Sequence, residues 1–214
     1  DTVTFTLDAS EALSGAGGGS LTLDIGGATA TASFDSFNSG DAVYSYTIQP
    51  GETDTDGLDV TGVNAPPGAL KDAAGNDLDT SFGSQTFASA TVDADAPVVT
   101  GLSGPSVTAL NGATITLTLA ASEDLSAAGG APSLSLDVAG SPETASFNSL
   151  SSGDALFTYT VSGTPQDLNG IEVTGASGLG DLEDAAGNAL SQGGFTLPTL
   201  SATKVDALAP TVAD

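Results

Sequence analysis

The sequence predicts an all-β fold: two tandem antiparallel β-sandwiches of about seven strands each, the first of which lacks its opening strand. Three observations predict this. The chain repeats itself, its apolar residues alternate with polar ones, and clusters of Gly, Asn, Asp and Ser separate the alternating runs. Alternation with a period of two indicates half-buried strands, and several short strands per hundred residues are typical of a β-sandwich.

The internal repeat carries most of this prediction. Residues 39–48 match residues 152–161, and residues 21–24 match residues 134–137, both at an offset of 113 positions. The block Leu-Lys-Asp-Ala-Ala-Gly-Asn, which begins at Leu70, recurs as Leu-Glu-Asp-Ala-Ala-Gly-Asn from Leu182, at an offset of 112. Several blocks in one order at nearly one offset establish a duplication.

The matched blocks also give the domain organisation. We expect one repeat at residues 1–96, a second at 97–209 and the start of a third at 210–214. Nothing in the first repeat matches the opening-strand sequence at residues 97–104. We therefore expect this chain to be a section of a longer protein.

The second repeat shows its strands most clearly. Threonines separate Ile115, Leu117 and Leu119, and the same alternation recurs at Leu134, Leu136 and Val138 and at Phe157, Tyr159 and Val161. No segment has a helical period. The strands that we expect are residues 98–102, 113–121, 133–138, 143–150, 155–162, 170–175 and 195–205.

The charge balance restricts the partners. Two basic residues stand against 27 acidic ones, which gives a net charge of −25. Nucleic acid and anionic membrane surfaces both require Lys and Arg, so neither is an expected partner. No apolar run is long enough to insert into a membrane. Cations remain as partners, although the charge could also serve only solubility.

Catalytic machinery is not expected. The chain has no His and no Cys, which excludes nucleophilic triads and thiolate metal sites. The glycine-rich segment 15–19 lacks the Lys and the helix of a phosphate-binding loop. Each acidic motif occurs in both repeats, which favours a structural role. We predict that the protein is not an enzyme.

Four motifs resemble the bacterial immunoglobulin-like repeats of giant adhesins and other large secreted proteins. They are the linker Asp-Ala-x-Ala-Pro from Asp93 and Asp206, Ser-Glu at the end of a strand, Asp-x-Asp/Asn-Gly after a Tyr-Thr strand, and Asp-Ala-Ala-Gly-Asn. The resemblance implies immunoglobulin-like (cadherin-like) sandwiches, a secreted or cell-surface location, and extended stalks whose joints calcium stiffens.

Topology places the acidic motifs together independently of that resemblance. Successive loops of an antiparallel sandwich alternate between its two ends, so acids from separate loops should converge where two repeats meet. Clustered carboxylates repel one another, and Ca²⁺ accepts six to eight oxygen ligands of this kind. The predicted ligands at this joint are Asp93, Asp95, Glu123, Asp184, Asn188, Asp54 and Asp56. The corresponding residues elsewhere are Glu11, Asp72, Asn76 and Asp206.

Some of these residues have a plainer interpretation. Asp-Ala-Ala-Gly-Asn is also a turn sequence, and Asp41 and Asp154 are expected to shape turns. The linker at Asp206 has Leu208 where the first linker has Asp95, so a joint there should bind calcium less tightly.

Three functions remain open at this point. The first is a calcium-stiffened spacer of an adhesin, whose partners are neighbouring repeats and a host or surface ligand. The second is a subunit of an extracellular filament or surface layer assembled by strand exchange. The third is a carbohydrate- or protein-binding module, but no exposed aromatic cluster marks a binding face for it.

Overall fold

A computed structural model describes residues 1–127 and 129–212 of the chain. Strand accounts for 51% of the residues and helix for 1%, which confirms the all-β prediction. The chain divides into two compact units, Asp1–Asp95 and Ala96–Asp214. Among the described residues, no helix has the length and apolar character needed to cross a bilayer.

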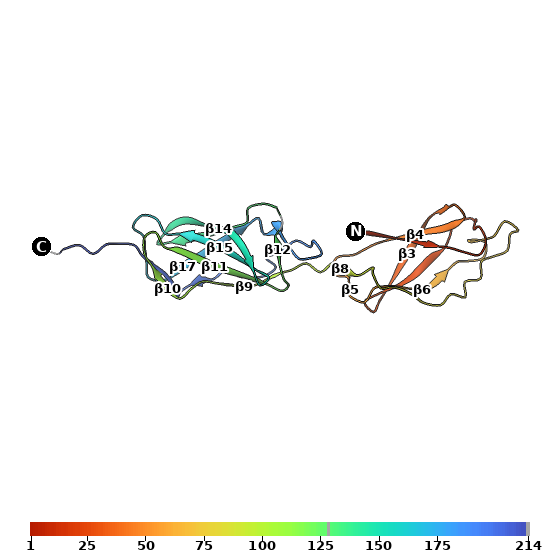
Figure 1. Ribbon diagram of the computed structural model, residues 1–214, viewed down its shortest axis with the longest axis horizontal. Coiled ribbons are helices and arrows are strands. Elements are labelled where there is room, and N and C mark those ends of the chain that lie inside the picture. The colour runs from red at the N-terminus through yellow and green to blue at the C-terminus, as the bar shows by residue number, and fades with distance from the viewer. Residues whose placement is uncertain (128, 213–214) are drawn as a thin grey trace. The chain divides into compact units, whose positions relative to one another are not determined.

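The first unit is built on one six-stranded sheet (Figure 1). Its strands lie in the order β1-β4-β3-β2-β6-β7, and all neighbouring pairs are antiparallel. A second sheet pairs β5 with β8. The bounds are β1 Thr2–Leu7, β2 Ser20–Ile25, β3 Ala28–Asn38, β4 Asp41–Thr47, β5 Thr53–Asp54, β6 Leu58–Asn64, β7 Gln85–Phe87 and β8 Val92–Asp93.

The second unit repeats this plan with additional strands. Its main sheet has the order β19-β17-β13-β14-β15-β11-β9, and smaller sheets join β10-β20-β16 and β12-β18. The bounds are β9 Val99–Ser103, β10 Val107–Ala109, β11 Thr114–Ala121, β12 Ser126–Ala127, β13 Ser133–Val138, β14 Ser141–Ser151, β15 Asp154–Thr160, β16 Gln166–Asp167, β17 Ile171–Ser177, β18 Leu182–Glu183, β19 Thr199–Leu200 and β20 Thr203–Asp206. A short 3₁₀ helix, η1, spans Leu179–Asp181.

Each unit has its own apolar core, and the alternating residues of the sequence supply it. Leu23 and Tyr44 are fully buried in the first unit, as are Leu117, Leu134 and Phe157 in the second. The polar residues between them face outward, so β11 and β13 show alternating burial. The period-two pattern therefore predicted which side chains form the cores.

One predicted strand is wrong. Residues 195–205 do not form a single strand but two short ones, β19 and β20, which belong to different sheets. A turn around Ser201 separates them, and Ser201 N donates to Thr199 O over 3.1 Å. Short strands β10, β12, β16 and β18 were not predicted, because two or three residues carry no readable period.

Of the segment expected to begin a third repeat, residues 210–212 form no strand, and 213–214 lie outside the described residues.

Candidate metal centre

The loop after β18 is organised around Asp184, which is only 5% exposed. Its Oδ1 accepts hydrogen bonds from the backbone N–H groups of Ala186, Gly187 and Asn188, each over 2.8 Å. Its Oδ2 accepts one from Asn188 Nδ2 over 2.9 Å. Three donors saturate Oδ1, so Oδ2 is the oxygen with capacity left for a ligand.

These bonds also determine the charge state of Asp184. Burial alone would raise the pKa of its carboxyl, but the bonds from Asn188, Gly187 and Ala186 more than offset this, and the pKa lies below its ordinary value. The carboxylate is therefore ionised at neutral pH. The loop holds a negative charge inside the protein surface, where a cation would be attracted.

A second carboxylate from a different loop lies beside it. Carboxylate oxygens of Glu123 and Asp184 lie within 4.8 Å of one another. Glu123 is held in place by its neighbour Ser122, whose Oγ accepts from Val98 N over 3.0 Å and whose N donates to Val98 O over 2.9 Å. The structure therefore brings together two of the predicted ligands, at the end of the second unit where β9 begins.

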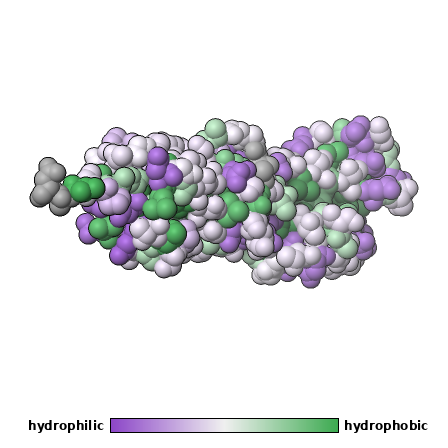
Figure 2. Space-filling model, turned by 60° about the vertical axis from the view of Figure 1, so that its left-hand side comes forward, coloured by the Kyte–Doolittle hydropathy of each residue, from purple (hydrophilic) through white to green (hydrophobic). Residues whose placement is uncertain are grey.

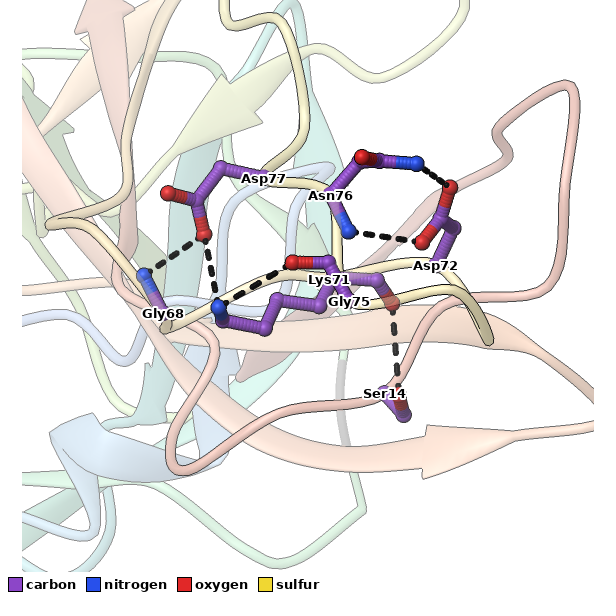
Figure 3. Close-up of polar contacts among 7 residues, drawn as sticks. All are labelled: Ser14, Gly68, Lys71, Asp72, Gly75, Asn76 and Asp77. Atoms are coloured by element: carbon purple, nitrogen blue, oxygen red, sulfur yellow. Dashed lines mark hydrogen bonds and ion pairs between the residues drawn. The ribbon is translucent and has the colours of Figure 1, made fainter.

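The corresponding loop of the first unit has the same form. Asp72 Oδ1 accepts from Asn76 N over 2.8 Å and its Oδ2 accepts from Asn76 Nδ2 over 2.7 Å, as Figure 3 shows. The bonds from Asn76 lower the pKa of Asp72. Glu11, the counterpart of Glu123, is exposed. Both Asp-Ala-Ala-Gly-Asn segments are thus closed Asp–Asn turns, whether or not a metal binds.

A lysine distinguishes this first loop. Lys71 Nζ lies 3.5 Å from Asp77 Oδ1 and donates to Gly75 O over 3.2 Å (Figure 3). At the equivalent position the second unit has Glu183, which adds negative charge where the first unit adds positive charge. The second unit is therefore the better candidate for a cation.

Asp54 and its counterpart Asp167 have a structural task. Asp54 accepts from Gly26 N over 2.9 Å and from Gly57 N over 2.8 Å, which fastens the β2–β3 turn to the turn before β6. Asp167 makes the same bonds to Ala139 N and Gly170 N, over 2.9 and 3.0 Å. Burial would raise the pKa of Asp54, but its hydrogen bonds from Gly26 and Gly57 lower it overall.

An acidic cleft surrounds this turn, and two of the acids that line it were not predicted from the sequence. In the first unit the cleft has a volume of about 460 Å³, and Asp54, the predicted and exposed Asp56, Asp24 and Asp59 all line it. Asp24 and Asp59 were not predicted as site residues. Their recurrence as acids after 113 positions, at Asp137 and Glu172, was a signal that could have found them.

The predicted linker residues are described within their own units. Asp93 ends β8, pairs with Thr53 and accepts at Oδ1 from Asp95 N over 3.4 Å. Both aspartates are exposed. In the second unit, Asp206 Oδ1 accepts from Gln166 Nε2 over 3.1 Å and from Leu208 N over 3.4 Å. Asp93 and Asp206 thus each accept a hydrogen bond from the backbone N–H two residues further on.

Hydropathy by itself does not single out a site on the face drawn in Figure 2. Figure 2 shows hydrophilic residues spread over the visible face, with apolar residues in small separate patches. Only specific geometry, such as the pairing of Glu123 with Asp184, therefore singles out a site. No protein-family model matches the chain, and searches of curated proteins and of solved structures also find no match.

Proposed function

We propose that this chain is a structural repeat module of a large bacterial secreted or cell-surface protein. In this proposal each unit is an immunoglobulin-like sandwich, and Ca²⁺ binds at the joint between consecutive repeats. The observation that carries the proposal is the pairing of Glu123 and Asp184 within 4.8 Å. The motifs that resemble bacterial immunoglobulin-like repeats support the context.

The donor set suits calcium. Glu123 and Asp184 offer carboxylate oxygens, Asn188 has an amide oxygen, and none of the nitrogen or sulfur ligands that zinc and copper prefer is present in the sequence. Two carboxylates at this distance repel one another when both carry charge, and a bound divalent cation removes that repulsion. The cation thereby stabilises the folded state relative to the unfolded one.

Chain connectivity supports a contribution from the linker. Pro97 O accepts from Ser191 N over 2.9 Å, which fixes the start of the second unit beside the β11 and β18 loops. Asp93 and Asp95 precede Pro97 by four and two residues, so they lie within about 14 Å of it at full extension. Ligation by either residue would restrict the linker, which is the mechanical role that we propose for the ion.

The partners in this proposal are neighbouring repeats of the same polypeptide, with a host or surface ligand bound elsewhere in the parent protein. The scarcity of basic residues disfavours nucleic acid and anionic membranes. The role is structural, without catalysis.

Calorimetric titration of the full chain with Ca²⁺, after treatment with a chelator, tests the proposal. Glu123→Gln keeps the side-chain shape but removes one charged ligand, and it should weaken calcium affinity by about tenfold or more. Glu172→Gln is the matched control, because it makes the same change on an exposed strand position that lines the acidic cleft beside Asp167. It should leave the affinity unchanged.

The melting temperature supplies a second measurement. Calcium at a hundred times its dissociation constant should add about 2.7 kcal/mol of stability to the unit that binds it. Solution scattering with and without calcium would report whether the linker becomes more restricted. If calcium produces neither heat nor a shift in melting temperature, the metal part of the proposal is wrong.

A further inference from the structure

The second unit contains one pair of strands that run in the same direction. β10 pairs parallel with β20, in a register that extends from Val107 opposite Thr203 to Ala109 opposite Val205. Every other pair of named strands in the described part of the chain is antiparallel. β10 belongs to the opening segment of the unit, which we define as residues 97–109, and β20 is its last strand. The beginning and the end of this unit are therefore joined side by side in parallel.

The start of the opening segment is fixed to the rest of the second unit. Ser191 N donates to Pro97 O over 2.9 Å, and Val99 N donates to Ser191 O over 3.0 Å. β9 follows at once and pairs antiparallel with β11 of the main sheet. A pull on the chain ahead of Pro97 therefore reaches β9 first and then β10.

The contact between the opening segment and β20 is close and largely buried. Val107 N donates to Ala202 O over 3.0 Å, and Thr203 Oγ1 donates to Pro105 O over 2.8 Å. Thr203 is only 1% exposed. A Cβ on Gly104 would lie 2.5 Å from Thr203 Oγ1, so the two stretches of backbone approach one another as closely as a glycine permits. Water has little access to the bonds that join them.

β20 is also held on its other side. It pairs antiparallel with β16, where Asp167 lies opposite Val205, and Val205 is fully buried. Just beyond the strand, Ala207 N donates to Pro165 O over 2.9 Å. β20 therefore cannot slide along β10 without also breaking its contacts with β16.

The parallel direction decides how tension acts on this pair. Tension along the chain pulls the N-terminal end of the opening segment and the C-terminal end of β20 in opposite directions. Because β10 and β20 are parallel, the pulled ends lie at opposite ends of their ladder, and the force runs along the strands. All bonds of the ladder are then loaded together, in shear. If both pulled ends lay at one end of the ladder, the bonds would break one after another at a lower force.

We propose that the opening segment and β20 form a mechanical clamp, which makes the second unit resist unfolding under tension. Forced unfolding is governed by the unfolding rate rather than by the equilibrium free energy, so the direction of the load matters. The clamp consists of hydrogen bonds and buried contacts and needs no metal ion. It is therefore independent of the calcium binding proposed above, and a failure of either proposal leaves the other standing.

Optical-tweezers measurements on the full chain, with a chelator present, test the clamp. The sequence has no cysteine, so a pair of introduced cysteines gives unique attachment points. Val98→Cys with Leu208→Cys pulls the start of the opening segment against the end of β20, and Leu110→Cys with Leu208→Cys pulls the C-terminal ends of β10 and β20 apart. The three side chains are 39%, 56% and 66% exposed at Val98, Leu208 and Leu110, so the replacements disturb little. The first geometry should require severalfold more force, and equal forces would overturn the proposal.

A matched pair of variants tests the contacts themselves. Thr203→Val keeps the side-chain shape but removes the bond to Pro105 O. The control, Thr174→Val, removes the bond from Thr174 Oγ1 to Ser135 O over 3.3 Å, which joins β17 to β13 outside the clamp. Thr203→Val should lower the unfolding force in the first geometry only, and Thr174→Val should lower it in neither. An equal loss of force from Thr203→Val in both geometries, or no loss in either, would contradict the inference.

Discussion

The buried carboxylate of Asp54 offers the sharpest test of how these loops are held together. Asp54→Ala removes two short hydrogen bonds, to Gly26 N at 2.9 Å and Gly57 N at 2.8 Å, and a longer one to Asp56 N at 3.3 Å. A hydrogen bond to a charged group contributes about 1.5–3 kcal/mol, but removing the charge also relieves repulsion from neighbouring acids. We expect the first unit to lose about 2–3 kcal/mol of its free energy of unfolding.

The control is Asp56→Ala, which makes the same change two residues away at an exposed position. It should change the free energy of unfolding by less than about 0.5 kcal/mol. Urea unfolding in the presence of a chelator, with hydrogen exchange used to separate the two units, measures both variants without metal. A loss of 2–3 kcal/mol corresponds to a fall of roughly 10–20 °C in the melting temperature of a domain of this size. Equal effects of the two variants would refute the reasoning, and an effect of Asp56→Ala seen only with calcium would instead identify Asp56 as a ligand.

Four further outcomes are expected. The Tyr46 hydroxyl donates to Glu52 Oε1, and this bond, burial and the nearby Glu52 charge raise the pKa of Tyr46 to about 12. Absorbance titration should show that Glu52→Gln lowers this pKa. The contribution of the bond to stability is complete below pH 10 and should be lost as the pH rises towards 12. Tyr159→Phe should be neutral or stabilising by up to about 1 kcal/mol in thermal unfolding, because the buried Tyr159 hydroxyl has no hydrogen-bond partner in the described residues. Gly57→Ala should destabilise the first unit by more than about 2 kcal/mol in urea, because Gly57 has a φ of +106° and a Cβ there would lie 2.4 Å from a backbone oxygen. The pKa of Asp184 is lowered from 3.8, so its contribution to the stability of the second unit is fully present above that pH. This contribution should disappear as the pH falls through the lowered pKa, and acid titration followed by circular dichroism would detect the loss.

The main strands could be predicted from the sequence because their period is regular and occurs twice. Residues 133–138 were expected as a strand, and β13 has the same bounds. The short strands could not be predicted, since β10 and β16 exist only through pairing with β20, a long-range contact that leaves no local pattern. The same limit explains the wrong assignment at residues 195–205, where the chain changes sheets within a few residues.

The candidate site was predictable to a similar extent. The topology expected from the sequence placed Glu123 and the Asp184 loop at one end of the second repeat, and their carboxylate oxygens lie within 4.8 Å of one another. It could not show that Asp184 Oδ1 already accepts three backbone bonds, or that Asp54 fastens two turns together. Such roles depend on where individual N–H groups point, which motif spacing does not determine.

The placement of the two lysines has a practical consequence. Trypsin cleaves after Lys and Arg, and this chain offers it only Lys71 and Lys204, one in each unit. Lys204 lies within β20, paired on both sides, and Lys71 forms a bridge with Ser14 and a contact with Asp77. Cleavage at either bond requires local opening of that strand or loop. The pattern of fragments would therefore report, from a single digestion, which unit opens first.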